Sequence, residues 1–215
     1  LSKLEIVLSK IVPAGMGWQG FSIIANNIGY NSTEIPFYLL TGLGDGVAVF
    51  GGHLSYFLLK KRCYDKTINI REQTEVGLLL GTAALCSGTS WQPIVNLLQY
   101  NEIGFLPSAV CTGLLTGSMF FGGLRLSRLM YGSLEYIEEN NKSNLKEDIS
   151  LSLSIGGATG TFLGTDVSYD SNPFLNILGI KETASNMEGI ITAGVSTGLG
   201  FSSIELIKSA VYNKK

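Results

Sequence analysis

A segment of twelve residues occurs twice in this chain. Residues 41–52 read TGLGDGVAVFGG and residues 112–123 read TGLLTGSMFFGG. The copies align without a gap at an offset of 71 and are identical at seven positions, where composition alone would give about one. Regularly spaced small residues are typical of helices that pack closely in a membrane. The duplication therefore predicts a membrane-helix unit that is repeated along the chain.

Weaker internal matches extend the repeat over the rest of the chain. Residues 193–201, AGVSTGLGF, resemble the duplicated segment, and Trp18-Gln19 corresponds to Trp91-Gln92 at an offset of 73. An alternative for the third copy is coincidence among the 27 glycines of the chain. The matches favour one integral-membrane domain built from three helix pairs. Within residues 1–215, the expected repeat units are about 1–64, 72–139 and 145–212.

Charge and apolar length indicate the solvent of these helices. Charged residues make up 15% of the chain, below the ~25% of soluble domains. A spanning helix needs ~20 residues, and two consecutive apolar runs reach this length without a formal charge. We expect an all-α polytopic membrane protein with six transmembrane helices around a pseudo-threefold axis; the alternative is a soluble protein with buried core helices. The six runs are 11–33, 35–59, 76–100, 103–124, 149–165 and 189–207.

Basic residues alternate with these runs. Fourteen of the fifteen Lys and Arg residues fall in the termini or after the second and fourth runs, and only Lys181 falls elsewhere. The positive-inside rule then places both termini on the cytoplasmic, matrix or stromal side, without identifying the membrane. Lys3 and Lys10 imitate the start of a signal peptide, but the run that follows them has a counterpart later in the chain. The sequence begins with Leu1 rather than Met, which leaves a preceding segment open.

Glycines four residues apart lie on one face of a helix, so each pair forms a smooth surface. The expected role is helix–helix packing, and the alternative is a groove for a pigment or lipid. These helix-packing residues are Gly42, Gly46, Gly113, Gly117, Gly194 and Gly198.

Two ionisable residues interrupt the second run. A charge inside a membrane helix is costly unless it faces protein, water or an ion, so Asp45 is a candidate for a solute or ion path. The alternative is a buried carboxylate that is hydrogen-bonded to a neighbouring helix. His53, the only histidine, follows eight residues later on nearly the same face, roughly 12 Å along the axis. It is either a second station on the path or a hydrogen-bonded core residue.

Three further polar residues complete the expected path. Gln19 and Gln92 are repeated amides, which need partners in hydrocarbon. Asp166 ends the fifth run, where it is either a helix-end residue or part of a vestibule. Trp18 and Trp91, which precede the glutamines, are expected in the aromatic belts at the membrane surface.

No sequence motif identifies a reaction or a cofactor. The chain has no phosphate-binding loop, dinucleotide fingerprint, nucleophile elbow or HExxH, and nothing resembles a nucleic-acid module. We expect a non-enzymatic transporter or channel for an ion or small solute, in contact with the lipid bilayer and forming a homo-oligomer or binding other membrane subunits. The alternative is a non-catalytic membrane subunit or scaffold that packs into a larger complex or organises pigment or lipid. A central axis filled by Phe50, Met119, Phe120 or Phe121 would favour that alternative.

Overall fold

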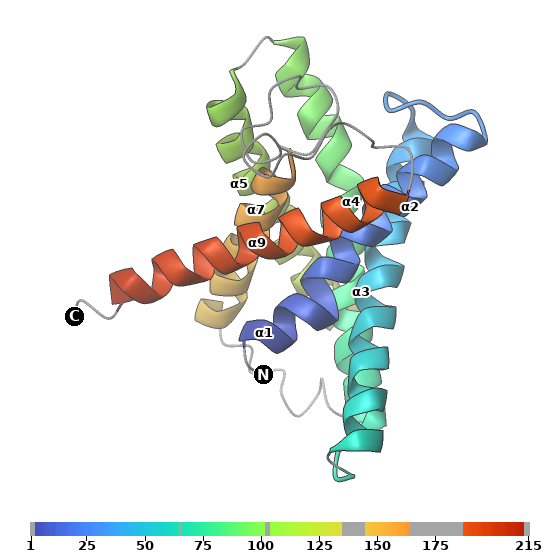
Figure 1. Ribbon diagram of the computed structural model, residues 1–215, viewed down its shortest axis with the longest axis vertical. Helices are drawn as coiled ribbons and strands as arrows, with labels where there is room; N and C mark the ends of the chain where they lie inside the picture. The colour runs from blue at the N-terminus through green and yellow to red at the C-terminus, as the bar shows by residue number, and fades with distance from the viewer. Residues whose placement is uncertain (1–2, 65, 102–103, 135–144, 164–186, 213–215) are drawn as a thin grey trace.

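The computed structural model is all-α over the residues that it describes, and its long helices other than α9 run up and down a single bundle (Figure 1). The described residues are 3–64, 66–101, 104–134, 145–163 and 187–212. Asp166 therefore lies outside the described residues. The helices are α1 (Lys3–Ile6), the π-helical turn η1 (Val7–Ile11), α2 (Val12–Asn27), α3 (Ile35–Cys63), α4 (Ile70–Tyr100), α5 (Phe105–Met130), α7 (Leu145–Leu163) and α9 (Met187–Tyr212).

A helix covers the described part of each expected apolar run, except that α2 ends at Asn27 and residues 28–33 of the first run form a loop. Several helices also extend past the apolar run at their basic end; α3 continues through Lys60, Lys61 and Arg62 to Cys63. Backbone hydrogen bonds hold these turns because lysine and arginine are good helix formers. By length and composition, two helices in the described part are apolar enough to cross a membrane, Ile35–Cys63 and Pro107–Met130.

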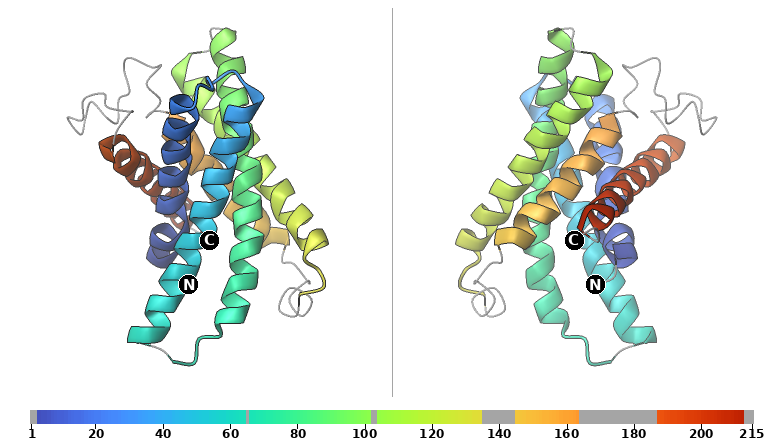
Figure 2. Two further views of the ribbon diagram at one scale, coloured as in Figure 1. Left: turned by 90° about the vertical axis from the view of Figure 1, so that its right-hand side faces the viewer. Right: turned by 90° about the vertical axis from the view of Figure 1, so that its left-hand side faces the viewer.

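The long helices form a closed ring of contacts. Helix α2 packs on α3, α4 on α5 and α7 on α9, so each consecutive pair is in contact. The second helix of each pair also packs on the first helix of the next: α3 on α4, α5 on α7 and α9 on α2. Helix α9 crosses the bundle obliquely (Figures 1 and 2). The last described helix thus closes the ring against the first pair.

The six expected packing glycines all face a neighbouring helix. A Cβ atom at Gly46 of α3 would lie 2.8 Å from the Gly81 carbonyl oxygen of α4. The corresponding atom at Gly117 of α5 would lie 2.7 Å from the Ser152 carbonyl oxygen of α7. At these two interfaces the backbones approach so closely that a methyl group does not fit. Gly42, Gly113 and Gly194 meet backbone atoms of α4, α7 and α2 in the same way, whereas Gly198 faces the side chains of Val12 and Val7.

Small polar side chains are buried next to an apolar core, and many large apolar side chains are exposed. On α3, Thr41 and Asp45 are buried, whereas Leu39, Leu43 and Val47 are exposed. On α5 and α9, Thr112, Thr116 and Thr197 are buried, and Val110, Leu114, Val195 and Leu199 are exposed. Large apolar side chains are buried as well, among them Phe37, Phe120 and Phe201.

Replacing Gly117 by Leu should disrupt the bundle, because its side chain would overlap the α7 backbone. We expect a loss of roughly 1–3 kcal/mol or more in stability, measured as earlier unfolding or aggregation in detergent. Gly122→Leu is the matched control on the same helix, since nothing lies within 4 Å of the position that a Cβ would take there. Equal stability of the two variants would contradict the close packing of α5 on α7.

Candidate functional site

A cavity lies where the six long helices meet. Its volume is about 120 Å³, and residues of η1 and of all six long helices contribute to its wall. A water molecule needs about 10–15 Å³ by the same measure, so the space can hold several. Most of the wall is apolar, and its charged residues are Asp45 and Lys10.

Asp45 is the carboxylate of this cavity. Its side chain is 8% exposed, and Oδ1 has no hydrogen-bond partner. The flanking residues Gly44 and Gly46 allow α2 and α4 to pack close on either side. Gly88 of α4 faces the carboxylate, because a Cβ there would lie 2.7 Å from Asp45 Oδ2. The alternative of a carboxylate that is hydrogen-bonded to a neighbouring helix is therefore not what the geometry shows.

Both tryptophans line the cavity. Trp18 and Trp91 are 8% and 2% exposed, and their rings meet edge to face with centroids 4.7 Å apart. Trp18 Nε1 donates a hydrogen bond to the Gly88 carbonyl oxygen, and Trp91 Nε1 donates one to that of Thr159. The expectation of an aromatic belt is wrong for these residues, because their N–H groups find partners between helices rather than at a membrane surface.

Lys10 is a cavity residue that the sequence reasoning assigned to a terminal charge cluster. Gly52, seven residues after Asp45, packs on Ser9 and Pro13. Lys10 therefore lies roughly 10 Å from Asp45 along the antiparallel helices. A spacing of four residues from Lys10 through Ala14 to Trp18, all on the wall, was the signal that could have located it.

His53 lies outside the cavity wall. Its ring is fully buried and packs against Phe57, with centroids 4.8 Å apart. It faces α4, where a Cβ at Gly77 would lie 3.3 Å from His53 Cδ2. Neither ring nitrogen has a hydrogen bond of good geometry, and Gln73 and Lys10 are near enough to act on the ring. Asp45 and His53 are thus on one helix but face different surroundings.

The two repeated glutamines are not brought to the cavity either. Gln92 is buried and its Nε2 donates to Asn96 Oδ1 over 2.8 Å. Asn96 Nδ2 in turn donates to the Ser32 carbonyl oxygen over 2.5 Å, which ties α4 to the loop between α2 and α3. Gln19 is partly buried on α2, where its backbone carbonyl oxygen accepts a hydrogen bond from the Ser22 hydroxyl.

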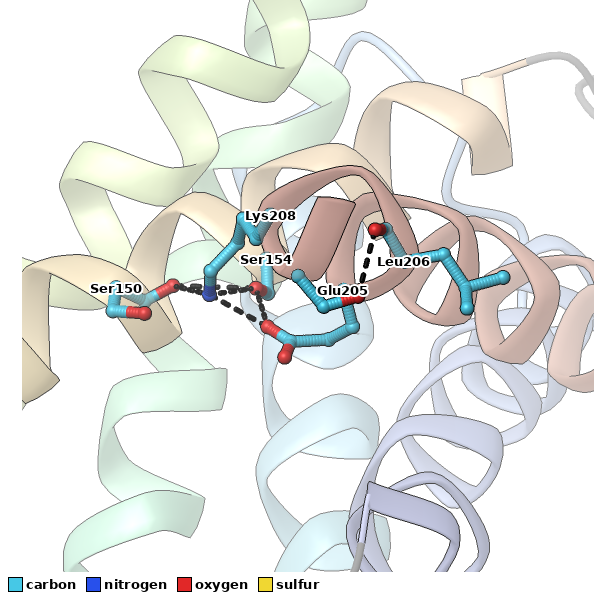
Figure 3. Close-up of polar contacts among 6 residues, drawn as sticks. Ser150, Ser154, Glu205, Leu206 and Lys208 are labelled. Carbon is cyan, nitrogen blue, oxygen red and sulfur yellow. Dashed lines mark hydrogen bonds and ion pairs between the residues drawn. The ribbon is translucent and has the colours of Figure 1, made fainter. Parts of the chain in front are cut away.

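A second polar cluster joins α7 and α9 (Figure 3). Lys208 Nζ lies 2.6 Å from Glu205 Oε1 and donates to Ser154 Oγ and the Ser150 carbonyl oxygen, at 2.9 and 3.0 Å. Ser154 Oγ also donates to Glu205 Oε1. Glu205, the acidic residue of the sixth run, therefore has its charge compensated locally. This cluster links helices and is not an open site.

Replacing Lys208 by Met should leave the mostly buried Glu205 carboxylate without its counter-ion. We expect a loss of roughly 1–3 kcal/mol in stability, measured by unfolding in detergent. The double variant with Glu205→Gln should lose less stability than the sum of the losses in the two single variants, because it no longer has an unpaired carboxylate. Additive losses would contradict the pairing.

Burial lowers the pKa of Lys10 to about 8, because the charged form loses water, and the nearby Glu5 carboxylate offsets part of this change. Lys10 precedes the first expected span. After ¹³C-methylation of the purified protein, one lysine NMR signal should titrate near pH 8, below the ordinary lysine value near 10.5. Lys10→Arg should remove that signal. If the methylated wild-type protein gave no lysine signal that titrates near pH 8, the burial of Lys10 would be contradicted.

Comparisons with known proteins add no assignment. No protein-family model matches the chain, and no curated protein or solved structure is significantly similar to it. Among the described residues, no group of three or more His, Cys, Asp or Glu side chains could hold a metal ion.

Proposed function

We propose that this protein is a small multi-pass membrane transporter or channel for an ion or small solute, with its path through the central cavity. Six transmembrane helices, in three repeated pairs around a pseudo-threefold axis, enclose the path, and both termini lie on the cytoplasmic, matrix or stromal side. The observation that carries the proposal is the buried Asp45 carboxylate, which lines a cavity and whose Oδ1 has no hydrogen-bond partner.

The exposed apolar side chains and the buried hydroxyls support a lipid surround. Exposed leucine and valine side chains follow the outer faces of α3, α5 and α9, and buried hydroxyls follow the inner faces. In water, an apolar surface of this extent favours association. In lipid, the same surface is compatible with the solvent, and polar groups belong inside the bundle.

Equivalent positions support the threefold arrangement. Asp45, Thr116 and Thr197 each stand three residues after the first packing glycine of their segment. All three are buried; Asp45 and Thr197 line the cavity, and Thr116 is hydrogen-bonded to Thr159, which also lines it. The repeat therefore brings one inward position per pair to a common centre, and only the first pair places a charge there.

A second candidate function, a membrane scaffold subunit, is favoured by one observation. Phe120 is 4% exposed and reaches the cavity wall, as bulky residues on the axis would in a protein without a path. Of the other three residues of that expectation, Met119 is 50% exposed, and Phe50 and Phe121 are partly buried. Of these four residues only Phe120 lines the cavity, which keeps a volume of about 120 Å³.

Reconstitution into liposomes tests the transport proposal. With a panel of small cations, anions and neutral solutes, at least one should enter protein-containing vesicles faster than protein-free ones in stopped-flow light scattering. Asp45→Asn should abolish that flux, because the charge that attracts or releases the solute is removed, while size-exclusion elution and helicity stay unchanged.

Glu147→Gln is the matched control, since it removes one exposed negative charge at the start of α7. Unchanged flux in Asp45→Asn would remove Asp45 from the path. No flux for any solute, together with purification as a fixed set of different subunits, would favour the scaffold function.

A further inference from the structure

The polar groups on the cavity wall present acceptors rather than donors. Both indole N–H groups are bonded to backbone carbonyls. The Ser87 hydroxyl donates to the Ala84 carbonyl oxygen over 3.0 Å, and the Thr197 hydroxyl donates to that of Ala193 over 2.6 Å. Each of these hydroxyl oxygens keeps a lone pair for another donor.

Thr159 follows the same rule through a small network. The Thr159 hydroxyl donates to the Gly156 carbonyl oxygen, and the Thr116 hydroxyl donates to the Thr112 carbonyl oxygen. The two hydroxyls also lie within hydrogen-bond distance of each other. Both hydroxyl hydrogens are therefore taken. Among the described residues on the wall, Lys10 is the one that brings positive charge and spare donors.

The negative and aromatic groups meet near Gly88. The Asp45 carboxylate lies against this glycine, and Trp18 donates to its carbonyl oxygen. Trp91 completes the group through its edge-to-face contact with Trp18. Both indoles line the cavity, and both N–H groups are engaged with backbone carbonyl oxygens. A carboxylate beside aromatic rings is the chemistry that recognises an ammonium group.

We propose that the central cavity binds a small cation with N–H donors, ammonium or a primary alkylammonium, with Asp45 as its counter-ion. This inference deepens the proposed transport function by naming the class of substrate, and it rests on that function for the movement of the cation across the membrane. Trp18 and Trp91 lie beside the bound group, and the oxygens of Ser87, Thr159 and Thr197 accept from its N–H bonds.

Other solutes fit the wall less well. An anion would meet the Asp45 charge and acceptor oxygens. A divalent ion prefers six to eight oxygen ligands with several carboxylates, and the wall has one carboxylate. An alkali ion can be coordinated by the same oxygens, so the feature that favours an ammonium group over it is the pair of indoles beside the carboxylate.

Lys10 itself carries a primary ammonium group, at the end of a flexible four-carbon chain. Lys10 lines the same wall, and its backbone lies roughly 10 Å from that of Asp45 along the bundle, so its positive charge disfavours a second cation in the cavity. The structure therefore assigns Lys10 the role of an internal competitor. Removing its charge should tighten binding of the external cation by roughly tenfold, from Coulomb repulsion at that separation.

Fluorescence provides a direct test, because Trp18 and Trp91 are the only tryptophans of the chain. The full chain in detergent is titrated with methylammonium chloride, ammonium chloride, sodium chloride or potassium chloride at constant ionic strength. Methylammonium and ammonium should give a saturable change in tryptophan emission that sodium and potassium do not give at the same concentration. An equal response to potassium, or no response to any of the four salts, would overturn the assignment without any variant.

Variants locate the site. Asp45→Asn should weaken methylammonium binding at least tenfold, Lys10→Met should strengthen it, and the exposed control Glu147→Gln should leave it unchanged. If Asp45→Asn does not fold by helicity and elution volume, Asp45→Thr replaces it, since threonine stands at the two equivalent positions of the repeat. Unchanged affinity in a folded Asp45 variant contradicts the proposal.

Binding and flux separate this inference from the transport proposal. Saturable methylammonium binding without flux in vesicles would contradict transport and leave the cation site standing. Flux of another solute that methylammonium does not inhibit would contradict the cation site and leave transport standing.

Discussion

Backbone contact between helices is the constraint on which this structure depends. At the α5–α7 interface, a Cβ at Gly113 would lie 2.6 Å from the Gly156 carbonyl oxygen, and one at Gly156 would lie 2.3 Å from that of Gly113. Such helices are joined along smooth surfaces, and the larger side chains are left for the centre and the outer faces. The small size of the cavity and the prominence of its one carboxylate both follow from this close approach.

Two acidic residues show how context separates structure from function in such an interior. Glu205 lies within reach of Lys208 and Ser154, so its charge is compensated by a local cluster. Asp45 has glycines on both sides and at Gly88 opposite, and these supply no side-chain donor. A buried charge that the fold leaves without a donor is costly, which is why its presence on a cavity wall points to an exchangeable partner.

The helices and their glycine faces could be predicted from the sequence, and Asp45 could be singled out as a charge inside a helix, because periodicity and a charge within an apolar run are local signals. The composition of the cavity could not. Lys10 was counted with the terminal basic residues, and the tryptophans were assigned to the membrane surface, because each assignment used the residue's position along its own helix. Their convergence depends on how α2, α4 and α7 cross, which the sequence of one helix does not determine.

The closure of the ring by α9 has a consequence for biosynthesis. Gly15 of α2 faces Ala193 and Thr197 of α9, so this face of α2 is covered only after α9 has been made and has docked. Until ribosomes have made α9, the nascent bundle is an open arc whose interior hydroxyls and carboxylate border on its surroundings.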